Sequence, residues 1–382
     1  MTSKAGGLNP EGDGRSLLGI RWLLVGVGAV LVSAVVGVAT GPVSIPLGQV
    51  VRELLDRLPL LEVDSSLSAV DRAIIWDLRA PRVVLGLLVG ALLAGSGAAY
   101  QGVFRNPLAD PYLLGIAAGA GLGATIAIVA ELRDVLGVVD PVPLVAFAGA
   151  LVAVTAAGTL SVRRGRVGSP TTLILAGVAV ANFFTAIQTF VQQQNSETLQ
   201  QVFAWILGRL STAGWAEVWL LLPYAAVSVV GLVLAVGPLD GLAVGDEEAS
   251  TLGLRPRAVR RAILVVASLG AAAAVAVSGL IGFVGLVVPH AVRLVAGASH
   301  RRVIPLSLLF GAAFLALADV VARTVQAPAE LPIGVITAFV GAPFFLVILR
   351  RQMASCAIRQ QPSAWPGQGS PWTWEVGRLS TA

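Results

Sequence analysis

Long apolar runs, separated by short polar connections, make up most of this chain. A helix needs about 20 mainly apolar residues to cross a membrane. Ten stretches meet or approach that length, at residues 22–39, 83–102, 112–130, 142–162, 171–192, 216–236, 262–279, 281–296, 304–325 and 333–349. The pattern therefore predicts an all-α polytopic membrane protein with about ten transmembrane helices.

The composition also indicates a membrane-embedded chain. Apolar residues make up 56% of the 382 residues and charged residues only 12%, with a mean hydropathy of +0.84. Charged residues are about 25% of an average soluble protein, so a soluble fold of this size could not cover so much apolar surface. A single cysteine, Cys356, and two histidines predict neither a disulfide framework nor a metal or cofactor site.

Arginine marks one side of the membrane in the predicted topology. It recurs in alternate connections and near both ends of the chain, at Arg15, Arg21, Arg105, Arg163, Arg164, Arg166, Arg255, Arg257, Arg260, Arg261, Arg293, Arg301, Arg302, Arg350, Arg351 and Arg359. The positive-inside rule then places both termini in the cytoplasm, in agreement with an even number of spans. The net charge of +5 lies mostly on this side, so it does not indicate nucleic-acid binding.

The polar segments divide the chain into three parts. Residues 1–20 are expected to form a cytoplasmic N-terminal segment, residues 21–352 the transmembrane domain, and residues 353–382 a disordered cytoplasmic tail without apolar periodicity. An external connection carries an amphipathic stretch at residues 45–61, which is expected along the membrane surface. The longest internal connection is residues 237–261.

Catalytic motifs are absent from the sequence. It contains no G-x-S-x-G, no H-E-x-x-H and no pair of cysteines. Because Lys4 is the only lysine, a phosphate-binding loop of the form G-x-x-x-x-G-K-[ST] is excluded. The chain is therefore not expected to be an enzyme, and any ATP hydrolysis would need a separate ATPase subunit.

Away from their ends, the predicted spans contain one carboxylate. Asp319 precedes Arg323 by four residues, which puts both side chains on one face of a helix and predicts an ion pair between them. The alternative is a proton or sodium relay through Asp319, as in a secondary transporter driven by an ion gradient. Such a carrier is expected to place several acidic residues in its spans, and this sequence offers one.

Two connections carry candidate interaction residues. In the internal one, acidic residues follow Gly245 and a second glycine, Gly253, ends the segment, which predicts a short amphipathic helix. The pattern alone favours a solvated loop and a docking knob for a cytoplasmic partner about equally. On the external side, Arg79 and Arg82 flank Pro81 at the start of the second span. They are either headgroup anchors or, since positive charge is unusual on that side, partners for carboxylates of another protein.

A weak internal echo is also present. Ser96-Gly97 precedes Pro107, and Ser278-Gly279 precedes Pro289, with the same spacing from serine to proline. The two copies lie five spans apart and would therefore have opposite orientations in the membrane. The echo thus indicates a possible inverted repeat.

Several motifs occur in an order that resembles one transporter family. They are Trp76-Asp77-Leu78-Arg79-Ala80-Pro81-Arg82, Gln101 with Asn106-Pro107-Leu108-Ala109-Asp110-Pro111, Leu175-Ala176-Gly177, Trp205-Ile206-Leu207-Gly208, residues 245–253, Phe283-Val284-Gly285-Leu286-Val287-Val288-Pro289-His290, Leu317-Ala318-Asp319 and Glu330-Leu331-Pro332-Ile333-Gly334. The set runs from about Ile20 to Arg351 and resembles the FecCD-type permeases. These are the membrane subunits of binding-protein-dependent ABC importers for ferric siderophores, haem and vitamin B12.

The resemblance implies a permease fold of the vitamin B12-importer type in the bacterial inner membrane. Two permease subunits, identical or different, would surround a central path, with cytoplasmic ABC ATPases and an extracytoplasmic substrate-binding protein as further partners. ATP-driven alternating access would carry the substrate into the cytoplasm. A ferric siderophore is the expected substrate, haem and cobalamin are the alternatives, and no cofactor is implied.

The resemblance also assigns roles to individual residues. Those that would dock the binding protein are Arg79, Arg82 and Arg323. Those that would couple to the ATPase are Gly245, Asp246, Glu247, Glu248, Ala249, Leu252 and Gly253. Those expected at the cytoplasmic gate are Ser169, Thr171 and Thr172, and the spans that begin at Thr171 and Ile333 are expected to line the path.

Overall fold

The computed structural model describes residues 11–43, 45–57, 67–132, 140–163, 166–167, 170–211 and 214–359. Helices form most of this part of the chain. They are α1 (Glu11–Ala39), α2 (Leu47–Asp56), α3 (Ala69–Ala73), α4 (Ala80–Phe104), α5 (Ile116–Val129), α6 (Pro141–Leu160), α7 (Pro170–Gln194), α8 (Leu199–Ile206), α9 (Trp215–Leu234), α10 (Val236–Ala243), α11 (Asp246–Thr251), α12 (Pro256–Ser278), α13 (Val284–Ala296), α14 (His300–Thr324) and α15 (Ile333–Arg359).

Short elements connect several of these helices. A π-helical turn, η1 (Ile74–Arg79), joins α3 to α4, and two 3-10 turns, η2 (Pro111–Leu114) and η3 (Ser196–Thr198), precede α5 and α8. Two antiparallel strands of two residues each, β1 (Val162–Arg163) and β2 (Arg166–Val167), lie between α6 and α7.

The apolar helices match the predicted spans. In the described part of the chain, seven helical segments are long and apolar enough to cross a membrane: Ile20–Ala39, Ala69–Phe104, Pro141–Leu160, Thr171–Gln194, Trp215–Leu234, Pro256–Ser278 and His300–Thr324. Three apolar helices are shorter: Ile116–Val129, Val284–Ala296 and Ile333–Ile348. Each predicted stretch coincides with one of these helices, so the all-α polytopic fold is confirmed.

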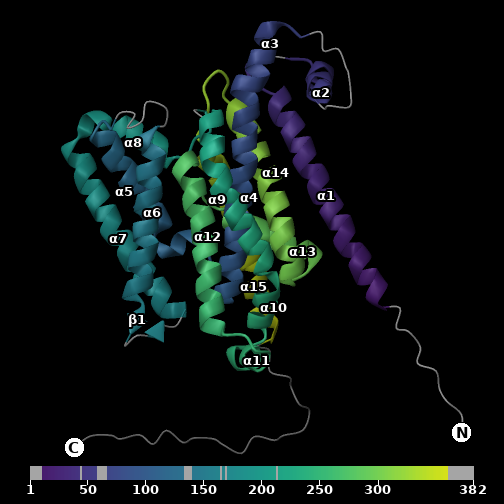
Figure 1. Ribbon diagram of the computed structural model, residues 1–382, viewed down its shortest axis with the longest axis vertical. Helices are drawn as coiled ribbons and strands as arrows, with labels where there is room; N and C mark the ends of the chain where they lie inside the picture. The colour runs from purple at the N-terminus through teal and green to yellow at the C-terminus, as the bar shows by residue number, and fades with distance from the viewer. Residues whose placement is uncertain are drawn as a thin grey trace, which may run out of the picture. The chain divides into compact units, whose positions relative to one another are not determined.

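The helices up to Gly341 pack as one compact unit, and a second unit begins at Ala342, within α15. In the first unit α4 is central and packs against α9, α12, α13 and α14 (Figure 1). Its glycines allow the backbones to approach closely. Gly97 lies against the carbonyl oxygen of Gly285 in α13, and Gly90 against that of Gly311 in α14, so neither position has room for a Cβ atom.

The amphipathic stretch predicted at residues 45–61 contains α2. The apolar side of α2 is buried at Val50, which packs with Val38 of α1 and Ile75 of η1. The buried carboxylate of Glu53 accepts a hydrogen bond from Trp76 Nε1 at 2.9 Å and lies 3.2 Å from Arg72 Nε. These contacts hold α2 onto the end of the bundle that α3 occupies, opposite the end that carries α11 (Figure 1).

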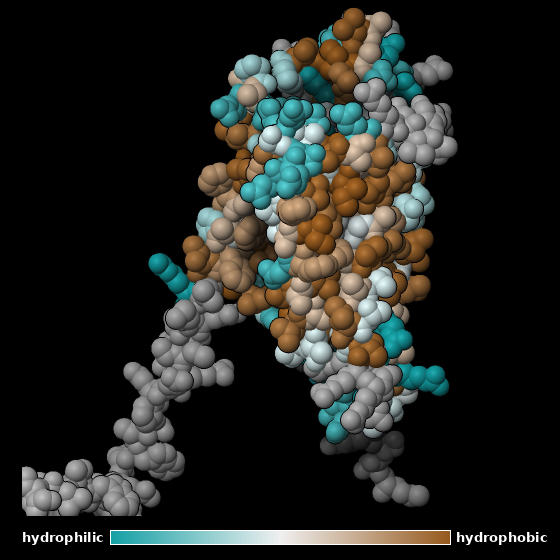
Figure 2. Space-filling view, turned by 90° about the vertical axis from the view of Figure 1, so that its left-hand side faces the viewer, coloured by the Kyte–Doolittle hydropathy of each residue, from teal (hydrophilic) through white to brown (hydrophobic). Residues whose placement is uncertain are grey.

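The molecular surface agrees with a membrane-embedded position. On the face shown in Figure 2, hydrophobic side chains cover most of the middle, and hydrophilic side chains gather toward the upper end. Many large apolar side chains are exposed, among them Leu175, Phe183 and Phe190 of α7. The acyl chains of a bilayer can cover such apolar surface, whereas its exposure to water would be unfavourable in free energy.

The two copies of the internal echo occupy different positions in their helices. Ser96 and Gly97 lie inside α4, whereas Ser278 ends α12 and Gly279 follows it with a φ of +72°. The landmarks are therefore not structurally equivalent, and the inverted repeat stays a prediction.

Candidate functional site

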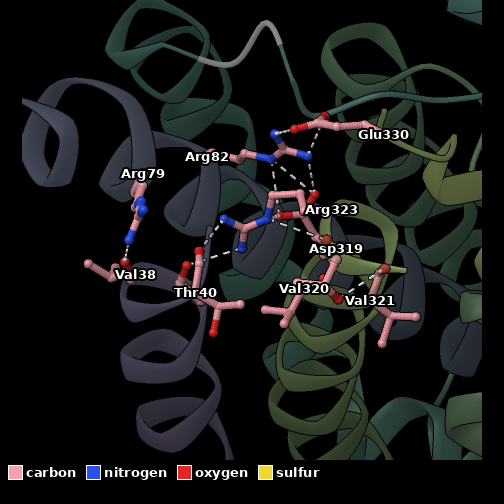
Figure 3. A network of polar contacts seen from close by, with 11 residues as sticks. Val38, Thr40, Arg79, Arg82, Asp319, Val320, Val321, Arg323 and Glu330 are labelled. Carbon is pink, nitrogen blue, oxygen red and sulfur yellow. Dashed lines mark hydrogen bonds and ion pairs between the residues drawn. The ribbon is translucent and has the colours of Figure 1, made fainter. Parts of the chain in front are cut away.

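A cluster of charged residues lies where α1 ends, α4 begins and α14 ends. We call Arg79, Arg82, Asp319, Arg323 and Glu330 the arginine cluster (Figure 3). Its members come from η1, α4, α14 and the connection that precedes α15. The cluster thus joins segments of the chain that are more than 200 residues apart in sequence, because Arg82 and Asp319 are separated by 237 positions.

Asp319 is the centre of the cluster. Its carboxylate is only 3% exposed, and it lies 3.0 Å from Arg323 Nε and 2.8 Å from Arg82 Nη2. Arg82 also reaches Glu330 at 2.9 Å. The ion pair that the spacing of Asp319 and Arg323 predicts is therefore present, and Arg82 is a second cation on the same carboxylate that the spacing could not reveal.

Two arginines of the cluster cap helix α1. The last carbonyl groups of a helix have no partner within it. Arg323 donates from Nη1 to Thr40 O at 3.0 Å and from Nη2 to Gly37 O at 3.1 Å. Arg79 donates from Nη1 to Val38 O at 3.0 Å and to Ala39 O at 2.9 Å, and from Nη2 to the carbonyl of Val43. Both guanidinium groups therefore stabilise the end of α1.

The three residues expected to dock a binding protein differ in how exposed they are. Arg79 is 5% and Arg323 is 4% exposed, and both have hydrogen-bond acceptors within the chain. The side chain of Arg82 is 12% exposed and lines a cavity of about 210 Å³ together with Arg209 and Glu330. Docking stays a prediction, and Arg82 is the member of the three that a partner's carboxylate could reach most directly.

A second cluster lies in the turn around α11, residues 245–253, which we call the α11 turn. Gly245 and Gly253 have φ values of +139° and +81°, a region that favours glycine. Between them Asp246 pairs with Arg105 at the end of α4, at 2.8 Å, and with Arg260 of α12. The α11 turn is thus bound through one carboxylate to two of the central helices.

The rest of the α11 turn has one buried and one exposed side. Ala249 is fully buried in the main apolar core, whereas Glu247 and Glu248 are exposed and Leu252 is 69% exposed. The exposed Leu252 and the two carboxylates beside it form a surface with an apolar centre and an acidic edge. The structure therefore contains the short helix and the glycine turn that the sequence predicts.

The attachment of the α11 turn is expected to depend on pH. The hydrogen bond from Arg260 holds the pKa of Asp246 below its ordinary value, which is about 3.9. A depressed carboxyl pKa contributes stability above the ordinary value and loses it as the pH falls through the folded value. Hydrogen exchange of the Ala249 and Thr251 amides, corrected for intrinsic rates, should be constant from about pH 8 to 5 and rise below about pH 4. In Asp246→Asn these amides should exchange fast throughout; pH-independent protection in both proteins would contradict the prediction.

The structure describes only part of the set of residues expected at the cytoplasmic gate. Thr171 and Thr172 lie in the first turn of α7 and are exposed, and Ser169 lies outside the described residues.

Sequence reasoning missed a further contact at this end of the bundle. Asp240 of α10 accepts a hydrogen bond from the backbone of His300 at 2.8 Å and lies 2.9 Å from His300 Nδ1. No local spacing indicates this pair, because its members are 60 residues apart.

Comparisons with known proteins identify the family of the chain. The model of the FecCD transport family matches residues 29–351. The chain is 44% identical to the cobalamin import system permease protein BtuC of Halobacterium salinarum, over 73% of this chain and 74% of that protein. It is 42% identical to the hemin transport system permease protein HmuU of Yersinia pestis, over 73% and 84% of the two chains.

A solved structure shares the fold as well. It is described as an inward-facing conformation of a metal-chelate type ABC transporter, and it superposes with a TM-score of 0.75 at 28% identity, over 87% of this chain and 99% of that one. Within the described residues, no group of three or more His, Cys, Asp or Glu side chains could hold a metal ion. The family match, the relatives and the shared helical fold lead to one conclusion: the chain belongs to the FecCD transport family.

Proposed function

We propose that the chain is the membrane-spanning permease subunit of a binding-protein-dependent ABC importer in the bacterial inner membrane, with both termini in the cytoplasm. The family match over residues 29–351 carries this proposal. Its relatives include permeases named for cobalamin, hemin and iron(3+)-hydroxamate. These substrates are all bulky metal chelates, and a ferric siderophore is the substrate that we propose first.

The α11 turn is the proposed contact for the ATPase subunits. Its exposed Leu252, Glu247 and Glu248 are available to a partner. Asp246 ties the turn to α4 through Arg105 and to α12 through Arg260. Because α4 is central in the bundle, a displacement of the turn on ATP binding would be passed directly to the helices that must move in alternating access.

A second permease subunit is proposed to cover α7. In the span Thr171–Gln194 only 11% of the residues of the most apolar window are buried, against 78% in the span that contains α4. Lipid alone could cover this face. A path between two subunits also requires an exposed helix that begins at the gate residues Thr171 and Thr172, and α7 satisfies that requirement.

Uptake by the reconstituted importer tests the function. The chain is co-purified from its native membrane, its ATPase and binding protein are identified by mass, and vesicles are supplied with a ferric hydroxamate, haem or cobalamin. Uptake of one chelate should need ATP and be insensitive to ionophores. Uptake that needs an ion gradient and no ATP would instead establish the secondary transporter.

One structural observation argues against the secondary transporter. Asp319 is already paired with two arginines, which leaves no free acid for ion coupling at this position.

Docking of the binding protein is expected to depend on Arg82. The variants Arg82→Gln and Glu330→Gln both remove the same ion pair. If Arg82 binds a partner's carboxylate, Arg82→Gln should weaken binding about tenfold or more, whereas Glu330→Gln should leave it unchanged or tighter, since the guanidinium loses a competitor. Surface plasmon resonance of the permease–ATPase complex with its binding protein measures both affinities. Equal weakening in the two variants would show that the pair acts only within the permease.

A further inference from the structure

We propose that a cavity between α6 and α12 binds one anionic phospholipid, with its phosphate on arginines of α12 and an acyl chain along the apolar wall. The cavity has a volume of about 850 Å³ and lies beside the end of α6, the beginning of α12 and the end of α4. It is separate from the arginine cluster, which lies at the opposite end of α4. None of the roles assigned above accounts for it.

Positive charge gathers on the part of the cavity wall that the beginning of α12 forms. Arg257, Arg260 and Arg261 line it from the first two turns of α12, and Asp246 is the one acidic residue among the described side chains that line it. Within the described part of the chain, Arg257 and Arg261 take part in no ion pair. Three guanidinium groups against one carboxylate leave an excess of positive charge, which suits a phosphate group.

One buried donor at this place lacks an acceptor. Arg260 pairs with Asp246 through its terminal nitrogens. Its Nε is buried and has no hydrogen-bond partner among the described residues. Buried polar groups are almost always hydrogen-bonded, so the orphaned Nε indicates that an acceptor belongs there. Because this Nε has almost no accessible surface, a phosphate oxygen in the cavity would reach it only after the Arg260 side chain shifts toward the cavity.

The apolar part of the cavity wall suits an acyl chain. Phe104, Leu114, Leu173, Leu264 and Val265 contribute apolar surface. The hydroxyl groups in the wall are already satisfied by their own helix or by a neighbour. Thr155 Oγ1 donates to Leu151 O at 2.7 Å, Thr159 Oγ1 to Ala156 O at 2.9 Å, Ser161 Oγ to Gly158 O at 2.7 Å, and Ser268 Oγ lies 2.6 Å from Tyr100 Oη. The wall therefore has little to offer a polar solute.

The arginines and the apolar wall are placed as the headgroup and the acyl chain of a lipid would require. Both α6 and α12 are long and apolar enough to cross a membrane, and the arginines lie at the beginning of α12, where a headgroup layer would be. Basic pockets between transmembrane helices on the cytoplasmic side bind anionic headgroups. A free phosphate would use the arginines alone, whereas a phospholipid uses the arginines and the apolar wall, so the phospholipid is favoured. Since Arg260 also holds Asp246, the bound lipid would lie directly against the α11 turn.

Native mass spectrometry of the purified full-length chain tests the proposal. The probes are phosphatidylglycerol and phosphatidylcholine with the same acyl chains. The wild type should retain phosphatidylglycerol preferentially. Arg257→Gln with Arg261→Gln should weaken that binding about 25-fold, since each arginine near a membrane surface contributes about a fivefold gain. The control, Arg255→Gln with Arg301→Gln, removes the same charge from residues outside the cavity and should bind as the wild type does.

A second variant tests the acyl-chain part without changing any charge. A Cβ atom added at Gly158 would meet nothing within 4 Å, and Gly158 lines the cavity. Gly158→Phe should therefore fill the cavity and abolish preferential retention of phosphatidylglycerol. Gly28→Phe, at a glycine of α1 with equally open surroundings, should not. Each protein must elute as a single species before it is measured.

Three results would overturn the proposal. They are equal retention of the two lipids by the wild type, displacement of phosphatidylglycerol by millimolar inorganic phosphate, which would establish a site for a soluble anion, and wild-type binding in both cavity variants. Because the charge variant and the filling variant act on different parts of the cavity, a folding defect in one leaves the other decisive.

Discussion

Asp319→Ala is expected to destabilise the protein by about 3–5 kcal/mol, the cost of removing one partner from a buried ion pair. Asp319 is 3% exposed and lies between Arg82 and Arg323. Without the carboxylate, two guanidinium groups remain close together in a poorly solvated place, and Arg323 cannot turn to water because it caps α1. The apparent melting temperature in mild detergent should fall sharply, and α1 should become accessible to protease.

Glu330→Gln is the matched control for this variant. It removes a carboxylate from the same arginine cluster, but Glu330 is 32% exposed and, among the residues that the structure describes, pairs with Arg82 alone. An exposed pair contributes roughly 0–1 kcal/mol, so the melting temperature should change little. If both variants melt alike, or if Asp319→Ala melts as the wild type does, the central role of Asp319 in the cluster is wrong.

Gly97→Ala is expected to destabilise the protein by about 3 kcal/mol, the upper end of the usual range for overpacking. The added Cβ would collide with the carbonyl oxygen, the carbonyl carbon and the Cα of Gly285 in α13. These are backbone atoms, so no side-chain rotation can relieve the collision, and α4 and α13 must move apart. The yield of monodisperse protein from membranes and its apparent melting temperature measure the effect.

Gly28→Ala makes the same chemical change in another membrane helix. At Gly28 an added Cβ would meet nothing within 4 Å, and alanine is a better helix former than glycine by roughly 0.5–1 kcal/mol. The melting temperature should stay the same or rise slightly. A similar loss in both variants would mean that glycine at these positions matters for helix flexibility and not for the contact between α4 and α13.

Properties that depend on local pattern could be predicted from the sequence. The ten apolar stretches coincide with apolar helices, because span length follows from hydropathy and helical rise alone. The pair of Asp319 and Arg323 follows from the geometry of a single helix. The glycine turn around α11 also follows from a short segment, since Gly245 and Gly253 adopt backbone angles that other residues avoid.

Contacts between helices could not be predicted in the same way. The sequence alone determined where the chain crosses the membrane and which residues share a helix face. Only the tertiary structure decided that Arg82 shares Asp319, that Arg79 and Arg323 cap α1 from inside the bundle, and that a cavity lies between α6 and α12. The physical reason is that acyl chains are as apolar as the faces of neighbouring helices, so hydropathy selects the spans but not their neighbours. A guanidinium group then binds whichever carboxylates and carbonyl groups the packing of small residues brings within its reach.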